Sequence, residues 1–495
     1  MSGRFLLAID QGTSSSRTVI YDHEADVVAS AQQEFPQIYP QPGWVEHDPE
    51  AIWDSVRSVT LQAMSNAGAD AADITAIGIT NQRETTLVWD RDTGQCVYNA
   101  IVWQDRRTAE VCRSLERDGV EATVVSKTGL RLDPYFSATK LAWILDNVEG
   151  VRERAESGKL AFGTIDCFLL WRLTGGARHA TDASNASRTL LFNIHTQQWD
   201  DDLLEIFNIP RELLPEVKDC AADFGVATDT CLGGDVPVLG IAGDQQAALI
   251  GQAGFEVGMT KSTYGTGCFV IANTGADALL SRNQLLTTVA MRLNGEVTYG
   301  LEGSVFVAGS AIQWLRDEMK IVESASQTEA IAERTGIVDD VVVVPAFAGL
   351  GAPYWDPGAR GAIVGLSRGS GGDQVVTATL QSVAYQTHDL ISAMAEDGIS
   401  PGVIRVDGGM VANDWFLQFL ADILNTPVER PRNVESTVLG AAYLTAYQSG
   451  VLQDSTQISE YWQCESRFDP TMSSDRREQL LNGWRAAVSR VRTNE

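Results

Sequence analysis

Several apolar, strand-like segments of this chain stop at an acidic residue and a tight polar turn, and this pattern narrows the folds that it can adopt. Residues 5–9 (FLLAI) are an uninterrupted apolar run, as expected for a strand buried on both faces. The run stops at residues 10–17 (DQGTSSSR), and a strand-like segment resumes at 18–21. Residues 238–242 (VLGIA) stop in the same way at 243–246 (GDQQ), before an alanine-rich helical segment. Strands that alternate with helices predict mixed α/β domains.

The other predicted elements continue this alternation. A helix is predicted to begin at Pro49, because Asp48 is a suitable N-cap and Glu50 places negative charge in the first turn. Its apolar stripe consists of Ile52, Val56, Val59 and Ala63. The further predicted strands are residues 27–35, 74–80 and 403–406, a tight turn is expected at 264–267, and residues 415–424 are predicted as an amphipathic helix.

The length of the chain predicts more than one domain. A chain of 495 residues exceeds one ordinary hydrophobic core. We expect two domains, residues 1–250 and 251–495, although no segment rich in proline or serine marks the boundary.

Charge and cysteine spacing argue against several classes of function. A net charge of −28 disfavours nucleic acid as a partner, because phosphate backbones repel such a surface. The seven cysteines contain no C-x-x-C pair, so neither a zinc site nor a disulfide framework is predicted. No run of about 18 apolar residues and no signal-peptide pattern is present, so we expect no membrane insertion and a cytoplasmic location.

Residues 10–17 have the composition of a phosphate-binding turn. Asp10 ends a predicted strand and can hold Mg²⁺ through water, and Gly12 lets the backbone approach a ligand closely. The residues that follow offer backbone N–H groups and side-chain hydroxyls to phosphate oxygens. The alternative interpretation is a polar hairpin turn, which such a stretch by itself favours.

Asp244 is a second strand-end carboxylate. Phosphorylation of an alcohol requires removal of the hydroxyl proton, and a positioned carboxylate does this in kinases. The alternative is that Asp244 only caps the following helix. With the glycine turns at 264–267 and 407–409, the two aspartates predict a nucleotide held in a cleft between two domains.

Other nucleotide and hydrolase motifs are missing or out of context. No G-x-x-x-x-G-K-[ST] occurs, since Leu160 follows Gly158-Lys159, and no strand-linked G-x-G-x-x-G occurs. Residues 365–369 (GLSRG) match the G-x-S-x-G of serine esterases, which requires a sharp strand-to-helix elbow. Here the chain continues through Ser370 before a helix predicted to be capped at Asp373, so a glycine-rich loop is predicted instead.

Several segments of the chain match the motifs of one known family: residues 10–17, 78–86 (GITNQRETT), 103–107 (WQDRR), 243–248 (GDQQAA) and 264–269 (YGTGCF). Two further segments, residues 135–143 (YFSATKLAW) and 361–381, match the two signatures of that family. Over essentially its whole length the chain therefore resembles the FGGY carbohydrate kinases, and in particular the members that phosphorylate glycerol. The resemblance implies an α/β protein with two domains of the actin-like ATPase (ribonuclease H-like) fold around a nucleotide and substrate cleft.

The resemblance also implies roles for individual residues in the ATP-dependent phosphorylation of glycerol to sn-glycerol 3-phosphate, the first step of glycerol catabolism. Asp244 is expected to be the general base and Asp10 to help hold Mg²⁺. The residues expected to bind glycerol are Arg83, Glu84, Trp103, Tyr135, Asp244, Gln245 and Phe269. Those expected to bind ATP are Thr13, Ser14, Ser15, Arg17, Thr266, Gly309, Gln313, Gly409 and Asn413.

These residue types suit a triol. Arg83 can donate to hydroxyls, Glu84 and Asp244 can accept from them, and the rings of Trp103 and Phe269 can cover the carbon backbone. A longer sugar would add hydroxyls that aromatic rings cannot satisfy, at ~1–3 kcal/mol for each buried unpaired group. The alternatives are a kinase of another short polyol or triose and, in a different class, an actin-like ATPase that performs conformational work.

Regulation is not expected to follow the family. Some members bind fructose 1,6-bisphosphate through a glycine-arginine loop, whereas residues 231–236 (CLGGDV) carry an acid there. No histidine lies between His195 and His388 to serve as a phosphorylation site, and residues 469–478 do not match the segment that binds the glucose-transport regulator. We expect an enzyme insensitive to all three controls and, from the family's tendency, a homodimer or homotetramer.

Overall fold

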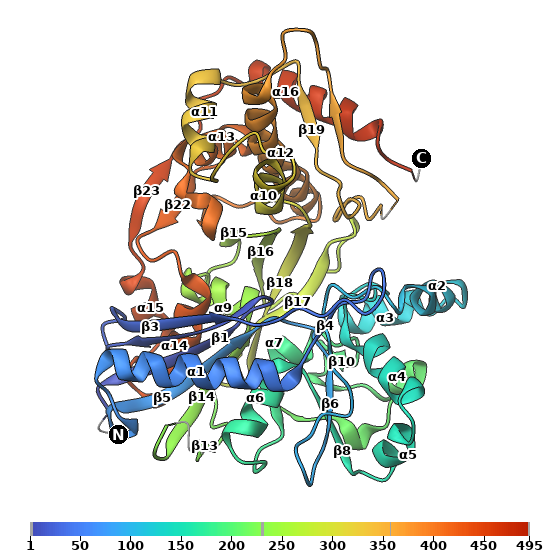
Figure 1. Ribbon diagram of the computed structural model, residues 1–495, viewed down its shortest axis with the longest axis vertical. Coiled ribbons are helices and arrows are strands. Elements are labelled where there is room, and N and C mark those ends of the chain that lie inside the picture. Colours follow the sequence, from blue (N-terminus) through green and yellow to red (C-terminus); the bar gives the residue numbers. More distant parts are fainter. Residues whose placement is uncertain (1–2, 229–231, 357, 494–495) are drawn as a thin grey trace.

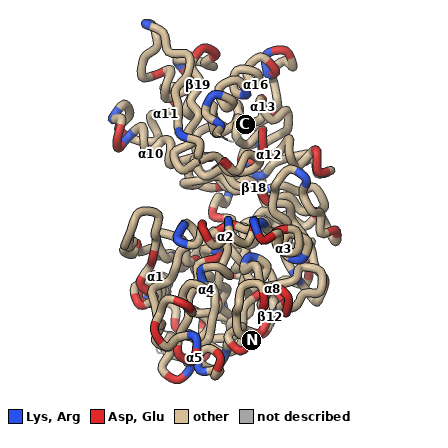
Figure 2. The backbone as a smooth tube through the Cα atoms, turned by 90° about the vertical axis from the view of Figure 1, so that its right-hand side faces the viewer, with Lys and Arg blue, Asp and Glu red and all other residues tan. Residues whose placement is uncertain are grey.

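Two mixed β-sheets, each covered by helices, organise the chain, one in the lower and one in the upper half of Figure 1. This computed structural model describes residues 3–228, 232–356 and 358–493. Acidic residues are spread over both halves of the backbone (Figure 2), in keeping with the net charge of −28.

The first sheet contains six strands in the order β13-β14-β5-β1-β2-β3. They are β13 (Val226–Ala227), β14 (Val236–Gly243), β5 (Ile74–Asn81), β1 (Phe5–Gln11), β2 (Ser15–Tyr21) and β3 (Val27–Glu34). β14, β5 and β1 run parallel, whereas β1, β2 and β3 form an antiparallel meander. The strands predicted in these segments are confirmed.

Helices from distant parts of the chain cover this sheet. On one face, α1 (Pro49–Ala67) packs on β2 and β3, with Asp48 accepting a hydrogen bond from the backbone N–H of Glu50 as predicted. The predicted stripe is buried: Ile52, Val56, Val59 and Ala63. α14 (Ser436–Ser449), near the end of the chain, contacts β1, β5 and β14 as well as α9 (Asp244–Gly251). A Cβ atom on Gly440 would lie only 1.8 Å from the Ala247 carbonyl oxygen, so this close helix contact requires glycine.

The second sheet contains seven strands in the order β17-β18-β16-β15-β21-β22-β23. They are β17 (Leu286–Leu293), β18 (Glu296–Val305), β16 (Cys268–Gly275), β15 (Thr260–Tyr264), β21 (Ile404–Asp407), β22 (Val428–Pro431) and β23 (Cys464–Phe468). Its core is formed with residues of α12 (Gly372–Glu396), α13 (Asp414–Leu424) and α16 (Ser474–Ser489). The predicted turn at 264–267, the strand before Gly408 and the helix at 415–424 are confirmed.

The two sheets share one pairing pattern. In the first, β1 is antiparallel to β2, β2 is antiparallel to β3, and β1 is parallel to β5, which is parallel to β14. In the second, β15, β16, β18, β21 and β22 repeat the same relations. The two halves therefore have related topologies, as expected.

The esterase-like segment is a loop, but the helix after it begins earlier than predicted. Residues 365–371 follow β20 (Ala362–Val364), and α12 starts at Gly372 with Gly371 as its N-cap, so Asp373 lies in the first turn and the predicted cap was wrong. The Gly371 N–H donates to the Gln374 side chain at 2.9 Å. The bond pairs the N–H of the N-cap residue itself, and no side chain of a described residue caps the first N–H groups of this helix.

None of the helices in the described part of the chain combines the length and apolarity needed to cross a bilayer. The six cysteines within the described ranges are all unpaired, and Cys231 lies outside them.

Candidate active site

Three parallel strands of the first sheet end side by side at the predicted site. Asp10 of β1 lies opposite Thr80 of β5, which lies opposite Ala242 of β14. Asp10 is therefore at the same edge as the segment after β5, which carries Arg83, and the segment after β14, which begins with Asp244. The carboxyl ends of parallel strands are where α/β sheets bind ligands.

The turn after β1 is a tight hairpin. The Gly12 N–H donates to the Ser15 carbonyl at 2.9 Å, and Ser14 is exposed at the tip. Arg17, the register partner of Asp10, pairs with Glu435 at 2.5 Å. The segment is thus a polar hairpin, as in the alternative interpretation, and its hydroxyl groups lie at the edge where the three parallel strands end.

The Asp10 carboxylate suits a cation. Burial and the charge of Asp244 raise its pKa to about 7, and Arg17 opposes this shift. It makes no hydrogen bond to any residue that the structure describes, so its oxygens are available. Among those residues no cluster of three or more His, Cys, Asp or Glu side chains could hold a metal. The Asp10 carboxylate has the donor chemistry that Mg²⁺ prefers, since this ion takes oxygen ligands and completes its shell with water and substrate phosphates.

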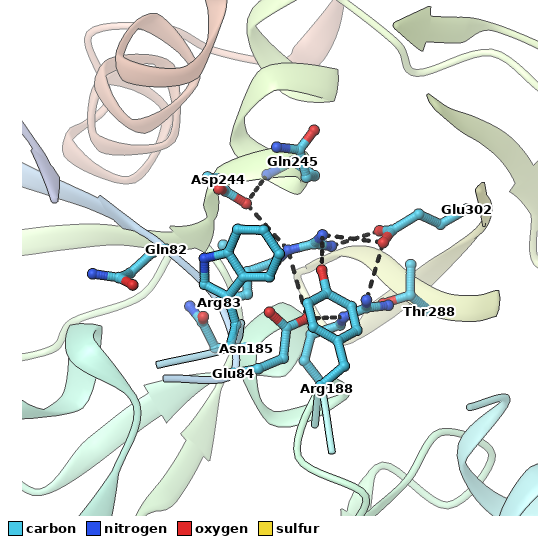
Figure 3. A network of polar contacts seen from close by, with 12 residues as sticks. Gln82, Arg83, Glu84, Asn185, Arg188, Asp244, Gln245, Thr288 and Glu302 are labelled. Atoms are coloured by element: carbon cyan, nitrogen blue, oxygen red, sulfur yellow. Dashed lines mark hydrogen bonds and ion pairs between the residues drawn. The ribbon is translucent and has the colours of Figure 1, made fainter. Parts of the chain in front are cut away.

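Arg83 is the centre of a buried polar network (Figure 3). Its Nε lies 3.1 Å from Oδ1 of Asp244. Its two terminal nitrogens donate to the two oxygens of Glu302, at 2.5 and 3.0 Å, and Nη2 also donates to the Tyr135 hydroxyl at 3.3 Å. Because Glu302 belongs to β18, this bidentate pair joins the two halves of the chain.

Glu302 and Arg188 are site residues that the sequence reasoning missed. Arg188 is fully buried, and it donates to Glu84 at 2.7 Å and to Glu302 at 3.0 Å. Burial would raise the pKa of Glu302, but Arg188 and Arg83 outweigh it and lower the value to about 2. Burial raises the pKa of Glu84, although the same two arginines oppose it. Glu84 also has a φ of 60°, which is uncommon outside glycine and recurs at functional sites.

One signal for Glu302 was present in the sequence. It lies in a largely apolar strand segment, residues 299–305 (YGLEGSV), and a lone acid in such a segment needs a buried partner. The sequence does not say which arginine supplies it.

Three aromatic rings line the site, as the resemblance implied. The Trp103 ring packs edge-on against Tyr135 and Phe269, with centroids 5.6 and 6.2 Å apart. All three rings are partly exposed. The Trp103 indole N–H donates to the Thr13 hydroxyl at 2.9 Å, so it links the aromatic wall to the turn after β1.

Asp244 opens helix α9 but does not cap it. The N-cap is Gly243, and Oδ1 of Asp244 accepts the adjacent Gln245 N–H at 2.7 Å. Burial raises the pKa of Asp244, against the opposing charges of Arg83 and Lys261. Asp244 is therefore a more basic carboxylate than an exposed one, with cations that favour its charged form.

The residues predicted to bind glycerol are connected. Tyr135 contacts Trp103 and Arg83, Arg83 pairs with Asp244, and Gln245 is hydrogen-bonded to Asp244. The list is completed by Glu84 beside Arg83 and Phe269 beside Trp103.

The residues predicted to bind nucleotide in the second half gather at a different place. Thr266 is exposed in the β15–β16 turn, and its carbonyl accepts the N–H of Ser310 at 3.0 Å. Gly309 opens α10 (Gly309–Asp317), and a Cβ atom on it would lie 2.5 Å from the Gly265 carbonyl oxygen. Gln313 is exposed one turn further along this helix.

Gly409 and Asn413 lie close to this group. Gly409 is exposed at the start of the 3-10 turn η3 (Gly409–Ala412), and Met410 of that turn lies 3.7 Å from the Cβ position of Gly309. Asn413 caps α13 by accepting the Phe416 N–H at 2.8 Å. Within the described ranges no hydrogen bond or ion pair joins these five residues to the Arg83 network.

Two family models match the chain. The N-terminal domain of the FGGY family of carbohydrate kinases matches residues 5–251, and the C-terminal domain of that family matches residues 260–449.

Relatives and a solved structure agree with this match. The chain is 61% identical over 491 residues to a glycerol kinase of Ectopseudomonas mendocina, covering 99% of each chain. It is 59% identical over 489 residues to glycerol kinase 1 of Pseudomonas aeruginosa, again covering 99% of each. A crystal structure of Plasmodium falciparum glycerol kinase with ADP superposes with a TM-score of 0.93 at 36% identity and covers 99% of both chains.

Proposed function

We propose a function from one premise: the chain belongs to the FGGY family of carbohydrate kinases. It transfers the γ-phosphoryl group of ATP to a terminal hydroxyl of glycerol and yields sn-glycerol 3-phosphate, the first step of glycerol catabolism. The names of its full-length relatives and of the ADP-bound solved structure support this activity.

The observation that carries the proposal is the Arg83–Asp244 pair beside three aromatic rings. Arg83 Nε and Asp244 Oδ1 are 3.1 Å apart, and Arg83 also donates to the Tyr135 hydroxyl. The Tyr135 ring packs against Trp103, which packs against Phe269. A triol needs both polar partners and a short apolar wall. The rings cover its C–H side, and the charged groups bind its hydroxyls. Arg83, Glu84, Tyr135 and Gln245 orient the triol in this scheme.

Asp244 acts as the general base. It takes the proton of the terminal hydroxyl as that oxygen bonds to the γ-phosphorus, while the bond from the γ-phosphorus to the bridging oxygen of ADP breaks. ADP leaves, and Asp244 later passes the proton to water. Its raised pKa favours proton uptake, and the nearby Arg83 favours its charged form before the reaction.

The phosphate side is formed by both halves of the chain. Thr13, Ser14, Ser15 and Arg17 approach the phosphates from the first sheet, and Thr266, Gly309, Gln313, Gly409 and Asn413 hold the rest of the nucleotide. Bound Mg²⁺, held by Asp10 largely through water, would neutralise charge on the β- and γ-phosphates.

The two domains contribute different parts of the site. The first domain, residues 1–250, carries the glycerol site and the phosphate turn, and the second, residues 251–495, carries most of the nucleotide site. The protein works in the cytoplasm, as a homodimer or homotetramer.

A substrate panel tests the function. The purified protein is assayed with Mg-ATP and glycerol, dihydroxyacetone, erythritol, xylulose or no acceptor, with ADP release measured by a coupled assay and product by ³¹P NMR. We expect glycerol to give the highest kcat/KM and negligible ADP release without an acceptor. Faster turnover of another acceptor, or ATP hydrolysis unaffected by glycerol, would refute the proposed function.

A further inference from the structure

A buried lysine lies behind the substrate side of the site. Lys261 belongs to β15 and is fully buried. Its ammonium group donates to the side-chain oxygen of Gln245, to the Thr263 hydroxyl at 2.8 Å and to the Phe269 carbonyl at 3.4 Å. An ammonium group has three N–H donors, so these acceptors use all of them. Lys261 therefore has no donor left for a ligand.

This arrangement determines how the Gln245 amide is turned. An amide has a donor end and an acceptor end, whereas the Lys261 ammonium can only donate. The Gln245 oxygen must face Lys261, and its NH₂ group must face away. Gln245 is only 6% exposed, and its NH₂ group donates no hydrogen bond to any residue in the described ranges. The NH₂ group keeps some contact with solvent, so it can donate to a ligand that enters the site.

We propose that Lys261 is a positioning residue, which fixes the Gln245 amide so that its NH₂ group donates to one hydroxyl of the bound triol. This inference rests on the proposed function, because it assigns the ligand of Gln245 as that substrate. Lys261 also donates to the backbone of Phe269, so one ammonium group holds a polar and an aromatic part of the same site.

The charges around Lys261 explain why a lysine is tolerated there. Burial lowers the pKa of Lys261, and the charge of Arg83 acts in the same direction. Asp407, Asp244 and Glu302 oppose this shift, so three acids stabilise the charged, donor-only form of the side chain. A neutral side chain that can also accept would let the Gln245 amide rotate.

The test compares glycerol with analogues that each lack one hydroxyl, 1,2-propanediol and 1,3-propanediol. In the unmodified enzyme, the analogue without the hydroxyl that Gln245 contacts is used less efficiently than glycerol. In Lys261→Met and in Gln245→Ala, we expect the kcat/KM ratio of glycerol to that analogue to fall by about tenfold, as for the loss of one hydrogen bond. The ratio for the other analogue and the KM for ATP are expected to change less than about twofold.

Conservative variants separate positioning from packing. Lys261→Arg keeps a donor-only group and should retain the kcat/KM ratio of glycerol to the affected analogue. Lys261→Gln adds an acceptor and should lower that ratio, so it tests the inference even if Lys261→Met folds poorly. Lys159→Met, at an exposed lysine, is the matched control and should leave both ratios unchanged.

Two results would overturn the inference. If the Lys261 variants lose kcat/KM equally for glycerol and for both analogues, Lys261 has only a structural role. Retention of the ratio in Lys261→Gln would show that the amide does not need a donor-only partner. If the unmodified enzyme phosphorylates glycerol, either result refutes only the role of Lys261. If it does not, the proposed function fails and the role of Lys261 with it.

Discussion

Arg83 and Asp244 meet with Nε and Oδ1 3.1 Å apart, although one follows β5 and the other follows β14. The parallel pairing of these neighbouring strands brings them to one edge of the sheet. Burial raises the pKa of Asp244, and the adjacent guanidinium opposes this shift and favours the carboxylate. The pair therefore provides a base that is both raised in pKa and available.

Replacing the base should abolish most of the turnover. We expect Asp244→Asn to lower kcat by about 10²- to 10⁴-fold, because the amide cannot accept the hydroxyl proton. ATP affinity, measured by isothermal titration calorimetry, should stay nearly unchanged. Asp475→Asn, at an exposed position on α16, serves as the control. Turnover near that of the control would rule out Asp244 as the base.

Glu302 should matter for both stability and substrate binding. Glu302→Gln leaves Arg83 and Arg188 without their shared carboxylate, and breaking a buried ion pair costs about 3–5 kcal/mol of unfolding free energy. We expect urea unfolding to detect a loss of this order and the KM for glycerol to rise, because Arg83 loses its bidentate partner. Glu296→Gln makes the same change at an exposed residue of the same strand and should have little effect. Equal stabilities of the two variants would contradict the prediction.

The stability contributed by Glu302 should depend on pH with a defined sign. Its pKa is about 2 in the folded protein, against an ordinary value of 4.5. Since the folded pKa is the lower one, the contribution is fully present above about pH 4.5 and is lost as the pH falls towards 2. The difference in unfolding free energy between the unmodified protein and Glu302→Gln should therefore be constant above about pH 5. Between about pH 4.5 and pH 2, this difference in unfolding free energy should shrink by about 1.4 kcal/mol for each pH unit of acidification. A difference that grows on acidification would disprove this sign.

The aromatic wall should determine substrate size. Trp103→Ala should raise the KM for glycerol by about tenfold and reduce the preference for glycerol over erythritol or xylulose, because the apolar face is lost. Trp103→Phe retains a ring but loses the 2.9 Å hydrogen bond to Thr13, so its selectivity should be closer to the original and its KM for ATP should rise more than that for glycerol. Steady-state kinetics with the substrate panel check both variants. Unchanged selectivity in Trp103→Ala would exclude this role.

Fructose 1,6-bisphosphate should not inhibit. Asp235 is exposed in the segment where a phosphate-binding arginine would be needed, and like charges repel. Cys231, the first residue of that segment, lies outside the described residues. Rates measured over a range of bisphosphate concentrations should coincide with those in inorganic phosphate at equal ionic strength. Dose-dependent inhibition by the bisphosphate alone would refute this prediction.

Local signals in the sequence predicted most of the elements that position the site. The apolar run before Asp10, the cap at Asp48 and the glycine turn at 264–267 each depend on neighbouring residues, and each forms as predicted. Helix α12 departs from the prediction, since it begins at Gly372 and the Gln374 side chain accepts the N–H of its N-cap residue Gly371.

The sequence by itself determined the alternation of strands and helices, the two strand-end aspartates and the motifs that place the chain in its family. Only the tertiary structure decided which buried charges meet. Glu302 pairs with Arg83 and Arg188, and Lys261 faces Gln245, across pairings between distant segments. A buried charge requires a partner, but its own sequence neighbourhood does not specify that partner, because strand pairing and helix packing bring it from elsewhere in the chain.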